Sequence, residues 1–268
     1  MSFRRVLLVV LGAVALPFSS TTPNAVAGVT AATTNVKPTV VLVHGAFADA
    51  SGWNGVVARL QAAGYAVLAV ANPLRDLAGD SAYVSSVLAS VPGPVVLVGH
   101  SYGGAVITNA AAGNSNVKAL VYVAGFAPDS GETSLELSDR FPGSTLPTAL
   151  VPRPYPGGVD GYIDPAKFRA VFAADLPEST TRLMAATQRP VSVGALSGPS
   201  GAPAWRSIPS WYLVAGSDKA IPPAAQRFMA KRAKSAVLEL PGASHAVMVS
   251  QPAATAAFIV AAARAAVR

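Results

Sequence analysis

The residues best placed to do chemistry in this chain are a serine, an aspartate and a histidine, in that order. Ser101 lies in Gly99-His100-Ser101-Tyr102-Gly103, directly after the apolar run of residues 95–98. Glycines on both sides of a serine permit a tight, strained turn that holds the hydroxyl above the end of a strand. A serine hydroxyl is a weak nucleophile at neutral pH, so it needs a base in hydrogen-bond reach and an acid that orients the base.

Only one of the three histidines is placed to act as that base. His245 follows the last predicted strand, in a turn that contains glycine, where the carboxyl ends of parallel strands meet. His100 precedes Ser101 in the turn and should point away from it, whereas His44 ends the first strand. We therefore expect His245 to be the base, and the alternative is a surface histidine in a turn.

The orienting acid should follow the strand before the last one. Asp218 does so, two residues after Gly216. The order serine, aspartate, histidine is the one expected when the nucleophile stands on a strand–turn–helix unit. Asp129, after the preceding strand, is the competing candidate. Asp49 and Asp139 are better explained as turn or cap residues.

Acyl transfer by such a serine also requires donors for the oxyanion. One should be the backbone N–H of Tyr102, which follows the nucleophile, and the other that of Ala46, in the loop after the first strand, with Phe47 adjacent. Because both donors are backbone groups, the sequence indicates them only through the glycines that allow the turns. Phe47, Trp53, Tyr102, Phe126 and Met248 are expected to line the substrate pocket, with plain core packing as the alternative.

Six apolar runs of strand length, interleaved with helical patterns, would position these residues. This alternation predicts a doubly wound, mostly parallel sheet with right-handed crossovers. Continuous apolar runs, rather than alternating ones, indicate strands buried on both faces. The expected strands are residues 39–43, 66–70, 95–98, 117–123, 211–215 and 236–240, and the expected helices are residues 54–63, 81–91, 105–112, 222–233 and 252–267.

The alternation stops between about residues 127 and 209. This stretch is rich in Pro, Gly, Ser and Asp, and it holds two helical segments, at 165–174 and 178–187, but no strand signal. An interruption of this length between two strands predicts an inserted helical cap over the carboxyl ends of the sheet, where α/β sheets bind ligands. Substrate specificity should lie there.

Composition limits the other possibilities. The chain has 268 residues, about half of them apolar, which is enough for one large α/β domain, residues 28–268. The net charge is +7, but the basic residues are scattered and not interleaved with aromatics, so we expect no nucleic-acid partner. The absence of cysteine excludes disulfides, thiolate catalysis and a lipid-anchoring cysteine. No histidine pair has metal-ligand spacing, so no metal is expected.

The first 27 residues match a secretory signal peptide. Arg4 and Arg5 are followed by eleven apolar residues, 6–16, and then by the small-residue cleavage pattern Ala25-Val26-Ala27. The apolar run is short for a bilayer span. We expect an exported protein, cleaved after Ala27 and without a stable membrane anchor. An unstructured or membrane-anchoring N-terminus is the alternative.

Taken together, these residues resemble the α/β-hydrolase superfamily over the whole length after the signal peptide. Three segments are similar to the plant methylesterase/hydroxynitrile lyase branch and its bacterial serine esterase relatives: residues 44–47 with Trp53, residues 99–104, and residues 244–252. The resemblance implies an α/β-hydrolase fold with about six parallel strands. It also implies a serine esterase that cleaves small or medium-sized carboxylic esters through an acyl-enzyme, without a cofactor.

Departures from the branch narrow the activity. Its hydroxynitrile lyases carry a threonine after the histidine of the first loop and a lysine after the catalytic histidine, whereas this chain has Gly45 and Ala246. Lyase activity is therefore disfavoured. Dehalogenases and epoxide hydrolases of this fold use an aspartate nucleophile, which Ser101 replaces. A cofactor-free perhydrolase or haloperoxidase shares the triad and stays open as an alternative, as does a non-catalytic ligand-binding protein on the same fold.

Overall fold

The computed structural model describes residues 37–266, all of which belong to a unit spanning Asn35–Arg268. The predicted signal peptide, residues 1–27, and its cleavage site after Ala27 lie outside the described residues. Among residues 37–266, no helix combines the length and the apolar content that a membrane span requires.

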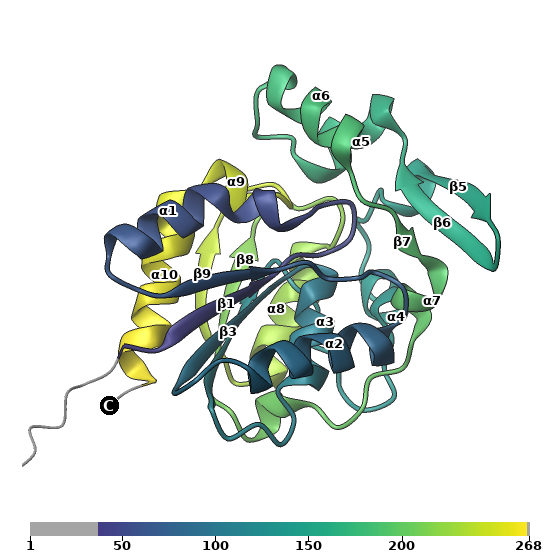
Figure 1. The fold of residues 1–268 in the computed structure, drawn as a ribbon. Helices are drawn as coiled ribbons and strands as arrows, with labels where there is room; N and C mark the ends of the chain where they lie inside the picture. The colour runs from purple at the N-terminus through teal and green to yellow at the C-terminus, as the bar shows by residue number, and fades with distance from the viewer. Residues whose placement is uncertain (1–36, 267–268) are drawn as a thin grey trace, which may run out of the picture. The chain divides into compact units, whose positions relative to one another are not determined.

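A six-stranded parallel sheet forms the centre of the fold (Figure 1), which confirms the predicted fold class. The strand order is β2-β1-β3-β4-β8-β9. The strands are β1 Thr39–Val43, β2 Val67–Val70, β3 Val95–His100, β4 Val117–Val123, β8 Ser210–Ala215 and β9 Ala236–Leu240. β3 is buried along its whole length, as its continuous apolar run predicts. β2 is an edge strand in which Leu68 is 39% exposed, so the expectation of a strand buried on both faces is wrong there.

The strand order brings distant loops together. β1 pairs directly with β3, and Val43 lies opposite Gly99, so the loop after β1 borders the turn that holds Ser101. β8 and β9 are also neighbours, which places the loops of Asp218 and His245 side by side. Between β1 and β3 the chain order reverses, and this switch point at the carboxyl edge is where α/β sheets bind ligands.

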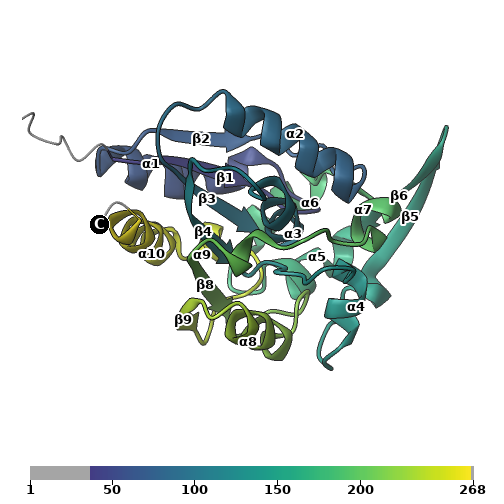
Figure 2. The same cartoon turned by 90° about the horizontal axis from the view of Figure 1, so that it is seen from below.

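Helices cover both faces of the sheet (Figures 1 and 2). On one face, α1 and α10 pack Leu60 and Ile259 against Val40 and Val98. On the other face, α2, α3 and α8 pack residues such as Leu88, Ile107 and Met229 against the opposite side of the same strands. The helices are α1 Asn54–Ala62, α2 Leu77–Ala89, α3 Tyr102–Ala110, α8 Pro223–Arg232, α9 Val247–Ser250 and α10 Pro252–Ala265, with the 3-10 helix η1 at Ala50–Trp53.

The segment between β4 and β8 forms the inserted cap, and Figure 1 shows much of it gathered at one end of the sheet. Both predicted helices are present, but the cap also contains a three-stranded antiparallel sheet, β5-β6-β7, which was not predicted. Pro152 and Pro154 are tolerated in β5 because β5 is an edge strand that pairs only with β6. The elements are α4 Ser134–Asp139, η2 Pro147–Ala149, β5 Leu150–Tyr155, β6 Gly158–Ile163, α5 Pro165–Phe172, α6 Glu178–Thr187, β7 Val191–Ser192, α7 Val193–Ser197 and η3 Ala204–Arg206.

Candidate active site

The turn between β3 and α3 holds Ser101 in a strained conformation. Its backbone has φ 52° and ψ −126°, a left-handed φ that non-glycine residues rarely adopt. The turn closes tightly, because a Cβ on Gly99 would lie only 2.5 Å from the carbonyl oxygen of Gly103. The Ser101 carbonyl oxygen accepts hydrogen bonds from the N–H groups of Gly104, at 2.9 Å, and Phe126, at 3.0 Å. These contacts fix the serine at the N-terminus of α3.

The loop after β1 lies directly against this turn. Its Ala46 N–H and the Tyr102 N–H of α3 have no hydrogen-bond acceptor within the described residues. The Phe47 N–H, by contrast, donates to the carbonyl oxygen of Arg189 in the cap at 3.0 Å. Of the two neighbouring candidates in this loop, Ala46 is therefore the one whose N–H is available to an oxyanion, together with that of Tyr102.

Asp218 and His245 form a buried pair. His245 Nδ1 lies 2.7 Å from Asp218 Oδ2, and both residues are about 1% exposed. Asp218 Oδ1 accepts two further hydrogen bonds, from the N–H groups of Ala220 at 2.7 Å and Ile221 at 2.9 Å. An acceptor at Nδ1 fixes the imidazole tautomer that carries its proton there, which leaves Nε2 with a free lone pair to accept a proton.

Ser101 and His245 line one cavity beneath the cap. No hydrogen bond joins Ser101 Oγ to His245 Nε2 among the contacts of residues 37–266. Such catalytic hydrogen bonds are often long in a free enzyme and tighten when substrate binds. The rest of the cavity wall is mostly apolar, but α4 contributes two hydroxyl groups to it. The lining is completed by Ala46, Phe47, Phe126, Ser134, Leu135, Ser138, Leu146, Leu196, Ala220 and Ile221.

The other two histidines are buried supports. His100 Nε2–H donates to the carbonyl oxygen of His245 at 2.9 Å, and the two rings lie 4.7 Å apart. Burial, with His245 nearby, holds the pKa of His100 well below its usual value, so this ring is neutral. His44 Nε2 accepts the Asn72 N–H at 3.0 Å, and burial lowers the pKa of His44 also. Neither ring lines the cavity of Ser101.

The cap holds the histidine turn directly. The Ser244 hydroxyl donates to Asp175 Oδ1, and the Ser244 N–H donates to Oδ2 of the same carboxylate at 3.2 Å. The Ala246 N–H donates to the Phe172 carbonyl oxygen at 2.9 Å. The Phe172 ring also packs edge-on against the His245 ring at 4.9 Å. The end of α5 and the loop after it are therefore part of the site's framework.

Three of the five residues expected to line the pocket lie elsewhere. Trp53 is fully buried on the α1/α10 face of the sheet, where its ring meets the edge of His100, so its place is in the core. The Tyr102 hydroxyl donates to Asp80 Oδ2 at 2.8 Å, which takes that side chain into the core as well. Met248 lines a neighbouring crevice rather than the Ser101 cavity. Phe47 and Phe126 line the cavity itself.

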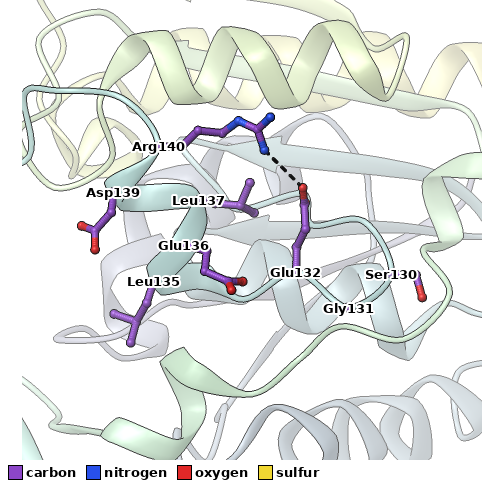
Figure 3. Close-up of a pocket in the computed structure, with 8 residues that line it drawn as sticks. All are labelled: Ser130, Gly131, Glu132, Leu135, Glu136, Leu137, Asp139 and Arg140. Carbon is purple, nitrogen blue, oxygen red and sulfur yellow. Dashed lines mark ion pairs between the residues drawn. The ribbon is translucent and has the colours of Figure 1, made fainter.

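The competing acid lies in a different cluster. Asp129 pairs with Arg206, and Glu132 beside it pairs with Arg232 at 2.7 Å. Glu132 also lines a separate pocket with Arg140, and Figure 3 shows those two side chains pointing toward one another. Neither Ser101 nor a histidine is among the residues that line this pocket. Within residues 37–266, no group of three or more His, Cys, Asp and Glu side chains is arranged to hold a metal ion.

Gln226, which contacts Asp218 from α8, is not among the residues predicted from the sequence. Its Nε2 donates to Asp218 Oδ2 at 2.8 Å, and its side chain is fully buried. The periodicity of α8 could have found it, because Gln226 shares a face with the buried Met229 and Ala230. A polar side chain on an otherwise apolar helix face beside the predicted acid is the signal.

Comparisons with known proteins identify the family and related folds. A sequence model described as the alpha/beta hydrolase family matches residues 40–258. "Alpha/beta hydrolase nvfD" of Aspergillus novofumigatus is 29% identical over 221 residues, 75% of this chain and 86% of that protein. Methylesterase 7 of Arabidopsis thaliana is 29% identical over 243 residues, 81% of this chain and 93% of its own. The crystal structure of a pyrethroid hydrolase from Sphingobium faniae superposes with a TM-score of 0.71 at 28% identity, covering 85% of this chain and 98% of that one.

Proposed function

This chain belongs to the alpha/beta hydrolase family, and we propose that it hydrolyses carboxylic esters with Ser101 as the nucleophile. The observation that carries the proposal is the buried hydrogen bond between His245 Nδ1 and Asp218 Oδ2, with His245 and Ser101 lining one cavity. Relatives named methylesterase and pyrethroid hydrolase support ester hydrolysis as the reaction.

The proposed mechanism uses the side chains and N–H groups that surround the cavity of Ser101. Ser101 Oγ attacks the ester carbonyl carbon while His245 Nε2 takes the hydroxyl proton, and Asp218 stabilises the resulting imidazolium. The negative charge on the carbonyl oxygen is held by the N–H groups of Ala46 and Tyr102. The tetrahedral intermediate collapses, His245 gives its proton to the departing alcohol oxygen, and an acyl-serine remains. Water, deprotonated by His245, then releases the carboxylic acid and restores Ser101.

We propose small or medium-sized esters as the substrate class. The side chains that enclose Ser101 are mainly apolar, and three of them, Leu135, Leu146 and Leu196, come from the cap. Such a wall suits an apolar acyl or alcohol group. Relatives whose names specify methyl esters or pyrethroids, all of them small molecules, support this class.

The proposal is tested by hydrolysis of p-nitrophenyl esters from acetate to palmitate. Ser101→Ala should reduce kcat/KM by about 10³-fold or more, because it removes the nucleophile. Ser130→Ala, which alters an exposed loop serine, is the matched control and should leave the rate unchanged. A fluorophosphonate should label Ser101 in the folded wild-type protein. Full esterase activity in Ser101→Ala would overturn the proposal.

We also propose that the protein is exported, on the strength of its N-terminal sequence. The pattern of paired arginines, an apolar run and Ala25-Val26-Ala27 predicts cleavage after Ala27. Expression in a secreting bacterial host should yield protein outside the cytoplasm whose N-terminal residue is Gly28. N-terminal sequencing that finds the intact leader on the exported protein would contradict it.

A further inference from the structure

Gln226 is a fully buried amide at the junction of β8, α8 and the Asp218 turn. Its Nε2 donates two hydrogen bonds of 2.8 Å, one to Asp218 Oδ2 and one to the Ile221 carbonyl oxygen. Its Oε1 accepts the Ala215 N–H at 3.0 Å. Both N–H groups and the carbonyl oxygen are therefore used, and a buried side chain with every group satisfied has one orientation.

The direction of the Gln226 amide follows from its partners. The Ala215 N–H can only donate, so Oε1 must face it. The other side of the amide faces a carboxylate and a carbonyl, which only accept, so Nε2 must lie there. A flipped amide would set an N–H against an N–H and an oxygen against two oxygens. Gln226 is thus a donor to Asp218.

Asp218 consequently receives four hydrogen bonds. Two backbone N–H groups occupy Oδ1, whereas Oδ2 is shared by Gln226 Nε2 and His245 Nδ1. The two backbone bonds come from the turn in which Asp218 itself lies. Gln226 is the one that ties the carboxylate to a regular element, because α8 packs against β8. That contact fixes the rotation of the carboxylate toward His245.

From this geometry we propose that Gln226 is a positioning residue for the triad. It holds Asp218 Oδ2 against His245 Nδ1–H. The lone pair of His245 Nε2 is then directed toward Ser101. The inference rests on the proposed function. Its consequence is that the hydrogen-bond donor at position 226, rather than the bulk of the side chain alone, contributes to turnover.

A first test replaces the amide by an apolar side chain of similar size. Gln226→Leu should lower kcat by about 10- to 100-fold, the range expected when a charged group loses one hydrogen bond, and leave KM unchanged. The substrate does not touch Gln226, so a KM effect is not expected. Wild-type kcat in this variant would overturn the proposal. Because the variant also leaves the Ala215 N–H unpaired, its folding could suffer, and a second variant avoids that.

Gln226→Glu has nearly the same shape and gives a different pH profile. While protonated, the new carboxyl group can still donate to Asp218 and accept from Ala215. Once ionised, it sets a second negative charge against Asp218, and two buried carboxylates in contact resist ionising together. The ratio of variant to wild-type turnover should therefore be highest at low pH and fall as pH rises. A profile with the wild-type shape would overturn the proposal.

Few other ionisable groups face this position. His245 and Tyr212 do, and burial holds the pKa of Tyr212 well above its usual value, so Tyr212 stays neutral throughout. Lys219 is exposed, and Arg227 pairs with Glu239 at the surface. Gln188→Glu is the matched control. Gln188, in the cap, bonds only backbone groups, those of Ile163 and Ala185, so its variant has no carboxylate partner and should keep the wild-type pH profile.

The readouts separate this inference from the proposed function. The pH profile of each variant is measured in two ways. One is the rate of p-nitrophenyl ester hydrolysis, and the other is the rate at which a fluorophosphonate labels Ser101. The labelling rate requires no knowledge of the natural substrate. A wild-type protein that neither hydrolyses esters nor labels at Ser101 overturns the proposed function and the inference with it. A labelled, active wild type with unaltered Gln226→Leu and Gln226→Glu profiles overturns the inference alone.

Discussion

Gly45 lets the loop after β1 lie against the nucleophile. A Cβ at this position would come within 2.5 Å of the Ser101 Cβ and 2.8 Å of the His100 carbonyl oxygen, closer than real atoms approach. The next residue, Ala46, supplies one of the two available N–H groups at the site. A side chain at position 45 would thus push an oxyanion donor away from Ser101.

We therefore expect Gly45→Ala to lower kcat/KM by about 10²–10³-fold, the effect of losing one oxyanion donor. Gly242→Ala is the control, because a Cβ there meets no atom within 4 Å. Hydrolysis of p-nitrophenyl acetate measures both, and circular dichroism verifies the fold. An unimpaired Gly45→Ala enzyme would show that the loop can move away without cost.

The residues that the sequence could predict are those tied to strand ends. Ser101, Asp218 and His245 each follow a strand whose apolar run is unmistakable, so their meeting at one edge follows from the topology. Trp53 and Met248 could not be placed in this way. Trp53 follows the loop after β1 and Met248 follows the His245 turn, and only the packing of η1 and α9 decides whether these large apolar side chains face the cavity or the core. Gln226 could be predicted only by knowing which face of α8 packs against the sheet.

At the scale of elements, the end of α5 acts as a support for the histidine turn. The carboxylate of Asp175 accepts both the hydroxyl and the N–H of Ser244, and the Phe172 carbonyl oxygen accepts the Ala246 N–H. These contacts fall on either side of His245. Movement of this part of the cap would displace the base, so it should stay in place during turnover.

We expect Asp175→Ala to lower kcat by about 3- to 10-fold, because a partly exposed hydrogen bond to a carboxylate is worth roughly 1 kcal/mol. Glu178→Ala, in the first turn of α6, is the control, and it should leave kcat at the wild-type value. Steady-state kinetics on one ester measures both variants. Equal kcat values for wild type and Asp175→Ala would mean that the cap does not hold the base.

The elements themselves were predictable where one local signal dominated. β1, β4 and β9 have the expected bounds, because each is a mainly apolar run closed by turn residues. The hairpin β5–β6 was not predictable, since Pro152 and Pro154 argue against a strand unless it is known to be an edge. Edge position is a property of the sheet and not of the segment. The same holds for β2, whose exposure follows from its place in the strand order.

At the scale of the whole molecule, two buried histidines link stability to pH. His44 and His100 are fully buried, and burial lowers the pKa of both below the ordinary value. In the unfolded chain each takes a proton below about pH 6.5. The folded protein resists that protonation, so acid favours the unfolded state. The stabilisation is fully present above pH 6.5 and is lost as pH falls below it.

We expect the free energy of unfolding to decrease on acidification below about pH 6.5, with a slope approaching about 1.4 kcal/mol per pH unit for each of the two histidines. Urea unfolding at a series of pH values from 8 to 5 measures this slope. His44→Gln should make it shallower, because one of the two protons is then missing, and the new amide oxygen can accept the Asn72 N–H in place of Nε2. The carboxylates that pair with arginines affect stability at lower pH. Arg232 and Arg227 hold the pKa values of Glu132 and Glu239 below their usual ones, so the stabilisation from these two pairs is lost only below about pH 4.5. A free energy of unfolding that is constant between pH 6.5 and 5, or that rises with acid, would show that His44 and His100 take up protons in the folded protein.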